Sequence, residues 1–329
     1  MPRNRRLFMH DEVRYVTMRT ERWLPLLATP FMEQILKGIL AQAASLYEVI
    51  IGELIVMGNH IHMMIVVNDP GVVDRFFRYF KTESAHAVNA LRGEKKGTVW
   101  EEGYDAPSIL NLSSLIEKVI YLHTNPQRAN LVRFIEEYPN ISSWSVLKSK
   151  GTQEVSVKRI RRTRIEALPA DSMSLADILR FSREQDKRLS GHLKLELNPR
   201  ACFEALTATS DLTYEEYRQR IVDGVKEKEQ ELEARRRKER KSVVGALRLK
   251  CQSIFKQHIP SKFGKRMICI CSDIATRIKY IRSYRAWCQL CVQAYEIWQA
   301  GNRSVQFPPG FYPPGLRPCA SLLPCAFWD

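Results

Sequence analysis

The sequence YEVIIGELIVMGNHIHMMIVV, residues 47–67, predicts two neighbouring strands joined by a tight turn. Both halves, residues 47–57 and His60–Val67, are rich in the β-branched and apolar side chains that strands favour. Gly58 and Asn59 between them tolerate a positive φ, as the central residues of a two-residue hairpin turn require. These two strands therefore predict the centre of a sheet.

The sequence around this hairpin predicts a mixed α/β domain. Residues 13–19, VRYVTMR, read as a further strand because they are rich in strand-forming side chains. Apolar residues repeat at helical spacing over residues 31–45 and again over 74–91. We therefore expect strands and helices to alternate in this part of the chain.

Charge is distributed unevenly along the 329 residues. Residues 1–145 hold 16 Lys and Arg and 16 Asp and Glu, so the whole net charge of +15 arises after residue 145. All eight cysteines also lie after residue 145. A positive surplus confined to one region indicates an electrostatic partner, and nucleic acid is the commonest partner of that kind.

No segment predicts export or membrane insertion. The longest apolar stretch, residues 47–67, is interrupted by polar residues that include Glu53, Asn59, His60 and His62, so it is not a run of ~20 apolar residues. Near the N-terminus the apolar stretch covers only residues 7–9, which is too short for a signal peptide. We therefore expect a cytoplasmic, nucleoid-associated protein whose cysteines are thiols.

Composition divides the chain into four parts. We expect a first domain over residues 1–146, a basic linker over 147–171, a helical DNA-binding region over 172–300 and a proline-rich tail over 301–329. The linker lacks sustained periodicity and carries a basic cluster, defined here as Lys158, Arg159, Arg161, Arg162 and Arg164. These side chains are the predicted contacts with DNA phosphates. A truncation ending near residue 150 is expected to keep its chemistry and to lose much of its affinity for DNA.

Two features of the helical region have alternative interpretations. Helices are expected over residues 175–189, 214–241 and 243–255, followed by an apolar stretch over 268–300. The charged segment 227–241 suits either a solvated helix with acid-to-base pairs or a basic helix that contacts DNA. Cys288 and Cys291 have zinc-ligand spacing, but aromatic residues surround them at helical spacing, which favours buried thiols.

The first candidate site lies on the returning strand, where His60 and His62 flank Ile61. Side chains alternate along a strand, so both imidazoles project from one face and Ile61 from the other. Two imidazoles held in this way can bind one divalent ion. The alternative is that two histidines near a hairpin are incidental.

The second candidate site lies on a predicted third helix. Ser114 and Glu117 have the spacing of a capping box, so the helix is expected to begin near Ser114. Pro126 is expected to end it just after Asn125. Tyr121 and Asn125 are four residues apart and share one face. Tyr121 is a candidate nucleophile beside a candidate metal ligand, Asn125, and the alternative for Tyr121 is an ordinary half-buried aromatic residue.

Two strings carry these candidate residues: G-N-H-I-H-M-M-I-V at residues 58–66 and Y-L-H-T-N-P-Q-R-A-N-L-V at residues 121–132. Together they resemble the HUH single-tyrosine transposases, and most closely the REP-associated tyrosine transposases. Shorter matches are V-T-M-R at 16–19, G-T-V-W at 97–100 and S-S-W at 142–144. The resemblance covers about residues 8–146. It departs at Gln127, where the family often has Val, and at Asn130, where the family usually has Gly.

The resemblance implies an α+β fold, in which a ferredoxin- or RRM-like antiparallel sheet carries helices on one face and a mostly helical C-terminal region follows. It implies that His60, His62 and Asn125 hold one Mg²⁺ or Mn²⁺ and that Tyr121 attacks the scissile phosphate. The product would be a 5′-phosphotyrosine, and the substrate single-stranded or hairpin DNA. Lys118, one turn before Tyr121, could supply positive charge, and the alternative that its position favours is an ordinary solvated lysine. Monomer and homodimer both stay open.

Two other functions fit the same residues. One is a domesticated protein that binds DNA repeats without transposition, and the other is a nickase of the relaxase or replication-initiator type. The intact set of His60, His62, Tyr121 and Asn125 argues against an inactive relative. The string N-P-Q-R-A at residues 125–129 favours the transposase.

Overall fold

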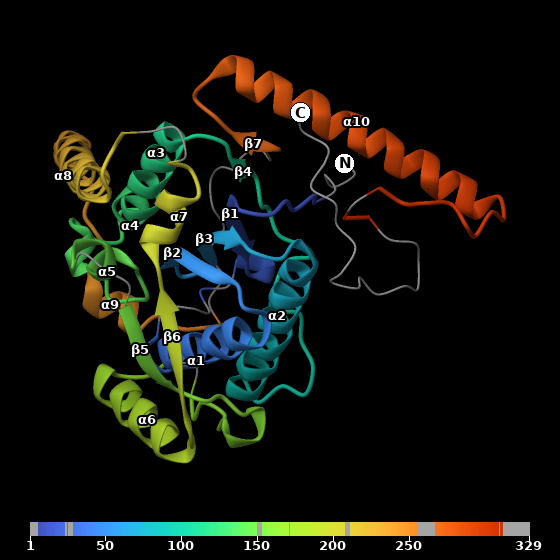
Figure 1. Cartoon of the computed structure of the whole chain (residues 1–329). Coiled ribbons are helices and arrows are strands. Elements are labelled where there is room, and N and C mark those ends of the chain that lie inside the picture. Colours follow the sequence, from blue (N-terminus) through green and yellow to red (C-terminus); the bar gives the residue numbers. More distant parts are fainter. Residues whose placement is uncertain are drawn as a thin grey trace.

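A five-stranded sheet with the strand order β2-β3-β1-β4-β7 forms the centre of the protein (Figure 1). The structure is a computed structural model that describes residues 6–23, 25, 29–149, 153–170, 172–207, 211–255, 267–308 and 310–311. The strands are β1 (Glu12–Arg19), β2 (Ile50–Val56), β3 (His60–Val67), β4 (Ser108–Ile109) and β7 (Cys269–Ile270). The first four pair antiparallel, whereas β7 pairs parallel with β4. The sheet is therefore mixed, not wholly antiparallel as expected, because the C-terminal region adds a strand to it.

The hairpin predicted over residues 47–67 is present as β2 and β3. A backbone hydrogen bond of 2.8 Å between the strand ends closes the turn. Neither Gly58 nor Asn59 has a positive φ, so the turn does not use the left-handed freedom expected of them. Asn59 instead ties the hairpin to β1, because its carbonyl accepts hydrogen bonds from the backbone N–H and the hydroxyl of Thr20 at 2.9 and 3.0 Å.

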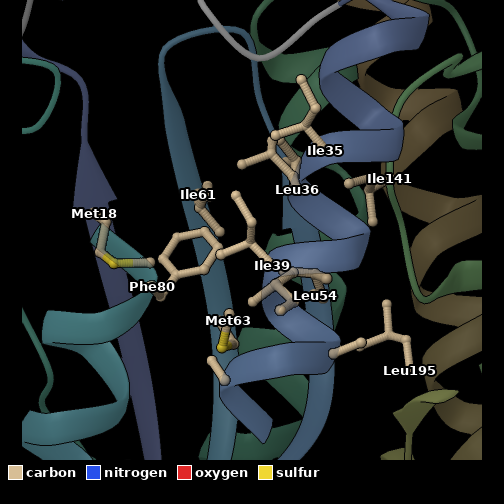
Figure 2. Packing of buried hydrophobic residues seen from close by; sticks show 14 of the residues in the cluster. Met18, Ile35, Leu36, Ile39, Leu54, Ile61, Met63, Phe80, Ile141 and Leu195 are labelled. Atoms are coloured by element: carbon tan, nitrogen blue, oxygen red, sulfur yellow. The ribbon is translucent and has the colours of Figure 1, made fainter. Parts of the chain in front are cut away.

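Helices cover both faces of the sheet, whereas the sequence predicted them on one. On one face, α1 (Pro30–Tyr47) and α2 (Pro70–Leu91) pack on Ile61 and Met63 of β3 (Figure 2). The other face packs against α3 (Leu112–His123), α7 (Pro199–Glu204) and α8 (Tyr214–Lys238), and α4 (Asn125–Arg128) follows α3. This second face carries His60 and His62, and it is called the histidine face below.

The region expected to be a linker contributes to a second sheet. β5 (Gln153–Lys158) pairs antiparallel with β6 (His192–Leu197), and α6 (Leu175–Arg188) lies between them in sequence (Figure 1). The predicted linker over 147–171 therefore contains a strand, which its lack of sustained periodicity did not indicate. The remaining elements are α5 (Trp144–Lys148), α9 (Ala246–Lys250), α10 (Ile274–Gln299) and the 3-10 helices Glu21–Trp23, Ile135–Glu137 and Arg162–Arg164.

Most helices predicted from periodicity are confirmed to within a few residues, namely α1, α2, α6 and α8. The helix expected over 243–255 shortens to α9, and the apolar stretch 268–300 divides into β7 and α10. The α+β fold class is confirmed, with a sheet domain followed by a mostly helical C-terminal region. No described helix is long and apolar enough to cross a membrane.

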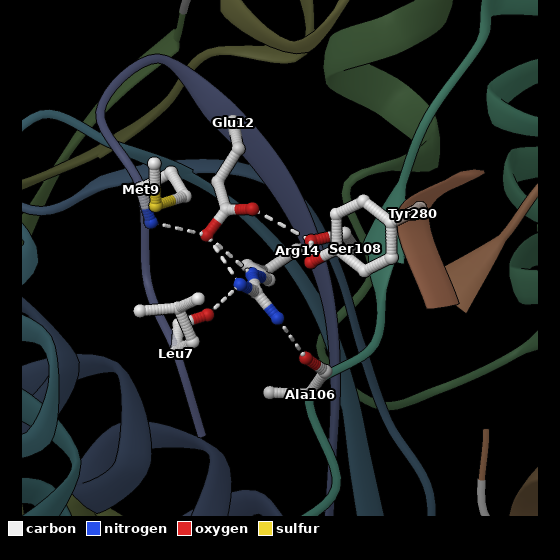
Figure 3. Close-up of polar contacts among 7 residues, drawn as sticks. All are labelled: Leu7, Met9, Glu12, Arg14, Ala106, Ser108 and Tyr280. Carbon is white, nitrogen blue, oxygen red and sulfur yellow. Dashed lines mark hydrogen bonds and ion pairs between the residues drawn. The ribbon is translucent and has the colours of Figure 1, made fainter. Parts of the chain in front are cut away.

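A polar network ties α10 to strands β1 and β4 (Figure 3). Arg14 of β1 is buried, and its guanidinium donates hydrogen bonds to Glu12 at 2.6 Å and to the carbonyl of Ala106 at 2.8 Å. Ser108 of β4 donates to the same carboxylate at 2.6 Å and lies 2.8 Å from the hydroxyl of Tyr280 on α10. Strands β1 and β4 are thereby joined to a helix that begins far along the chain.

The cysteines of α10 differ in burial. Cys291 is buried beside Leu7, Tyr284 and Trp287, so the prediction of a buried thiol is confirmed for Cys291. Cys288 is partly exposed. The tail from residue 312 on, with its two cysteines, lies outside the described residues.

Candidate active site

The two predicted histidines lie side by side on β3. Their ring centroids are 4.7 Å apart, and the ring planes are inclined at 81°. β1 runs antiparallel beside them and places Arg19 opposite His60 and Thr17 opposite His62. Strand alternation therefore brings the imidazoles together, and the neighbouring strand supplies a hydroxyl and a cation.

Each imidazole is held by a hydrogen bond at Nδ1. His60 Nδ1 lies 2.8 Å from Asn59 Oδ1, which is an acceptor, so Nδ1 of His60 carries the hydrogen. His62 Nδ1 lies 3.0 Å from the hydroxyl of Thr17. A ring held through Nδ1 presents the lone pair of Nε2, which is how metal-binding histidines are oriented. His60 is held in this form by Asn59, and the Thr17 hydroxyl can accept a hydrogen from Nδ1 of His62 in the same way.

Burial keeps both imidazoles neutral at physiological pH. It lowers the pKa of His60 to about 4, and the positive charge of Arg19 lowers it further in the same direction. Burial, followed by the neighbouring His60, holds the pKa of His62 well below its ordinary value. Since a neutral imidazole has the lone pair that a metal requires, these shifts suit metal binding.

The tyrosine helix, α3, begins earlier than predicted. Asn111 caps it by accepting a hydrogen bond from the N–H of Ser114 at 3.0 Å, so the first helical residue is Leu112. The predicted start near Ser114, with a capping box to Glu117, is therefore wrong. The cap was missed because asparagine and serine are both frequent caps and the sequence offers both within four residues.

Tyr121 lies beside the histidine pair at the surface. α3 buries Leu115, Val119 and Leu122 in the core, which leaves Tyr121 37% exposed. The Tyr121 ring centroid is 6.3 Å from that of His62. The Lys118 ammonium and the Arg128 guanidinium each lie 5.1 Å from the centre of the Tyr121 ring. The half-exposed Tyr121 ring therefore lies next to the histidine pair and between two positively charged side chains.

A second tyrosine, Tyr15 of β1, packs against the histidine pair. Its ring stacks on His62 with centroids 5.3 Å apart and planes inclined at 23°. Tyr15 is buried, and burial, followed by the nearby Tyr121, raises the pKa of Tyr15 well above its ordinary value. Tyr15 was not among the residues predicted for the site, although its place in the strand V-R-Y-V-T two residues before Thr17 puts it on the histidine face.

Asn125 is the first residue of α4 and does not end the tyrosine helix as predicted. α3 ends at His123, and Pro126 lies in the first turn of α4, where its missing N–H costs nothing. Asn125 is buried, and its Nδ2 has no hydrogen-bond partner among the described residues. No three His, Cys, Asp or Glu side chains gather into a metal site in the described part of the chain. An amide binds a metal ion through its oxygen and not through its nitrogen, so Oδ1 of Asn125 is the atom that could serve as a third ligand.

Part of the chain matches a known protein family. Residues 13–125 match the sequence model of the family described as "Transposase IS200 like". Residues 13–125 belong to the IS200-like transposase family. This IS200-like domain contains all four candidate residues of the site: His60, His62, Tyr121 and Asn125.

Two solved structures are similar to part of the chain. A REP-associated tyrosine transposase bound to a REP hairpin is 20% identical, with a TM-score of 0.40, and the match covers 46% of this chain and 87% of that one. A candidate transposase from Deinococcus radiodurans is 17% identical, with a TM-score of 0.26, over 36% of this chain and 95% of that one. No curated protein matches the chain.

Behind the tyrosine helix, the IS200-like domain contains a buried carboxylate. Glu53 of β2 is fully buried and accepts hydrogen bonds from Nε2 of His123 at 3.1 Å and from the hydroxyl of Ser143. The register of β2 shifts between Ile51 and Glu53, which turns Glu53 toward α3. Since His123 is two residues from Tyr121, this contact fixes the end of the tyrosine helix. A lone acid in the apolar run IIGELIV was the sequence signal for it.

The basic cluster is not at this site. Around it, the N–H of Arg159 donates to Gly191 at 3.1 Å, and the N–H of Ile160 donates to the Gln42 side chain of α1 at 2.7 Å. α1 covers the face of the sheet opposite the histidine face. The structure therefore separates the basic cluster from the histidine pair and the tyrosine. The cations beside Tyr121 are instead Lys118 of α3 and Arg128, the last residue of α4.

Proposed function

We propose that this protein cuts and rejoins one strand of single-stranded or hairpin DNA through a covalent bond to Tyr121. The observation that carries the proposal is the exposed Tyr121 ring, 6.3 Å from His62 and next to a pair of oriented, neutral imidazoles. The family relation supports transposase chemistry, and the similar REP-associated transposase was solved with a REP hairpin. We therefore propose a DNA hairpin as the substrate class.

We further propose that His60, His62 and Asn125 hold one divalent ion, Mg²⁺ or Mn²⁺. The fit rests on two adjacent imidazole rings that burial keeps neutral, and Oδ1 of Asn125 would be the third ligand. When bound, such an ion polarises a phosphate oxygen as a Lewis acid. Imidazole ligands favour Mn²⁺ over Mg²⁺, although availability can reverse that preference.

The chain's own residues supply the nucleophile and position the phosphate. The Tyr121 oxygen forms a bond to phosphorus while the bond from phosphorus to the 3′ oxygen breaks. The phenolic proton leaves to water, and the departing 3′ oxygen takes up a proton to become a 3′-OH. Lys118 and Arg128 face the negative charge of the phosphate. Because the phosphotyrosine retains the energy of the phosphodiester, attack by a 3′-OH reverses the step and rejoins the strand.

A labelling experiment tests this function. The full chain is incubated with Mn²⁺ and a pool of hairpin oligonucleotides that carry a fluorophore at either the 5′ or the 3′ end. Since Tyr121 is proposed to retain the 5′ phosphate, the 3′-labelled fragment is expected on the protein after denaturing electrophoresis. A covalent band with the 5′ label alone would reverse the proposed polarity, and no band with any hairpin would refute the function.

The basic cluster is proposed to contact DNA away from the cleaved phosphate. Replacing Lys158, Arg159, Arg161, Arg162 and Arg164 by Gln is expected to flatten the slope of log affinity against log salt by several units, at about 0.7–0.9 for each phosphate that the cluster neutralises. The rate of cleavage in bound complexes should be unchanged, because the cluster lies on the other side of the sheet.

The matched comparison is Lys118→Gln, which removes one cation beside Tyr121. This variant is expected to change the salt slope by no more than about one unit and to slow cleavage in the bound complex. Anisotropy titrations between 50 and 300 mM salt, roughly the range in which such slopes are measured, give the slopes. A cluster variant with the slope of the unmodified protein would mean that the cluster does not contact DNA.

A further inference from the structure

α8 of the C-terminal region lies directly on the helix that carries Tyr121. Gly224 of α8 approaches Ile120 so closely that a Cβ at position 224 would lie 2.4 Å from the Cδ1 atom of Ile120. Tyr217, Ile221 and Val225 of α8 share a buried cluster with Val119 and Leu122 of α3. This half of α8 therefore closes the core beneath the tyrosine helix, and it lies outside the IS200-like domain.

One charged side chain of α8 reaches α4, the single helical turn that begins at Asn125 and is called the Asn125 turn below. Glu229 is buried, and its Oε1 atom accepts hydrogen bonds from Nε2 of Gln127 at 2.5 Å and from the backbone N–H of Ile135 at 2.7 Å. Gln127 is itself buried in α4, two residues after Asn125. The carboxylate therefore joins α4 to the segment that follows it, and both ends of the turn are fixed from the C-terminal region.

The backbone that follows the turn, residues 130–132, is also hydrogen bonded to the C-terminal region. Asn130 has a φ of +54°, and its carbonyl accepts a hydrogen bond from the N–H of Val244 at 2.9 Å. The carbonyl of Leu131 accepts from Gly245 at 2.9 Å, and Arg236 of α8 donates to the carbonyl of Val132 at 3.3 Å. Residues from Gln127 to Val132 thus lie against one continuous stretch of the C-terminal region.

We propose that α8 positions the tyrosine helix and the Asn125 turn for catalysis, with Glu229 as the positioning residue. The inference rests on the proposed function of Tyr121 and Asn125. Glu229 contacts neither the DNA nor the reacting atoms, and it acts through Gln127. A displacement of about 1 Å at reacting groups can lower a rate about 100-fold, so a small movement of this turn reaches the chemistry.

The test compares three single variants of the full chain. Glu229→Leu keeps the size of the side chain but leaves Gln127 and the N–H of Ile135 without an acceptor. Glu229→Gln retains both contacts, since its amide can accept from Ile135 and donate to Oε1 of Gln127, a buried atom with no partner among the described residues. Arg218→Met is the matched control, because buried Arg218 of the same helix donates to the carbonyls of Leu147 and Lys148, far from α4.

Glu229→Leu is expected to lower the single-turnover rate of adduct formation about 10- to 100-fold, with the affinity for hairpin DNA unchanged. Glu229→Gln is expected to restore most of the rate. Arg218→Met is expected to lower the melting temperature as much as Glu229→Leu does and to leave the rate unchanged at temperatures where the protein is folded. Equal rates for Glu229→Leu and Arg218→Met would overturn the proposal.

A second readout does not depend on activity. Amide hydrogen exchange over residues 121–132 is expected to rise in Glu229→Leu and to stay at the level of the unmodified protein in Arg218→Met. If the unmodified protein forms no adduct, the proposed function fails, while this exchange measurement still tests whether α8 holds the turn. Unchanged exchange in Glu229→Leu would refute the positioning role by itself.

Discussion

Replacing Tyr121 by phenylalanine is expected to abolish strand cleavage and the covalent adduct while hairpin binding is retained. The variant loses only the hydroxyl oxygen, which is the proposed attacking atom. The ring keeps its neighbours His62, Lys118 and Arg128, so the shape and charge of the site stay the same. Adduct formation is measured by denaturing electrophoresis and binding by fluorescence anisotropy at one salt concentration.

Tyr15→Phe provides the matched control, because Tyr15 is the second tyrosine whose ring packs against His62. Its hydroxyl is buried and has no hydrogen-bond partner among the described residues, so its removal is expected to leave the adduct intact. An adduct that persists in Tyr121→Phe and disappears in Tyr15→Phe would assign the nucleophile to β1 instead of α3.

Removing either imidazole is expected to have the second large effect. His60→Ala and His62→Ala should each lower the cleavage rate by about 100-fold or more, because Lewis-acid stabilisation supplies several kcal/mol and each ~1.4 kcal/mol is a factor of ten. A chelator should lower the rate of the unmodified protein to the same extent, and added Mn²⁺ should restore it. Asn125→Ala is expected to be milder, since water can take one ligand position.

His86→Ala is the control for the loss of a histidine. His86 lies on α2, on the other side of the sheet, where it pairs with Glu83 at 3.6 Å. Its replacement should not change the cleavage rate or the response to chelator. Full activity of the unmodified protein in excess chelator would remove the metal from the mechanism.

The local parts of the site could be predicted from the sequence because they depend on short-range geometry. The alternation of a strand places His60 and His62 on one face whatever surrounds them, and the structure agrees. The ends of the tyrosine helix were predicted less well, because Asn111 and Ser114 are both good caps and Pro126 can either end one helix or start the next. Capping rules narrow the positions at which a helix can begin or end to a few residues, but they do not select one of them.

The long-range parts could not be predicted, because they depend on which segments meet. The sequence places the positive net charge after residue 145. In the structure the basic cluster lies next to α1, on the face of the sheet opposite the histidine face. The cations beside Tyr121 are Lys118 and Arg128, which precede residue 145. Gln127 and Asn130, the two departures from the resemblance, both contact the C-terminal region. A truncation near residue 150 would remove those contacts, so the structure reverses the expectation drawn from the sequence, and we expect the truncated protein to lose its chemistry as well as its affinity.

β7 is synthesised long after the other strands of its sheet, and this order affects folding on the ribosome. Asn111 at the start of the tyrosine helix is hydrogen bonded to Cys271 beside β7, and 160 positions separate the two in the chain. Until the ribosome has passed that point, β4 has an unpaired edge, and such edges pair readily with other chains. Because β4 spans only Ser108 and Ile109, this edge is short, and the start of the tyrosine helix gains its contact with Cys271 only after most of the helical region has been synthesised.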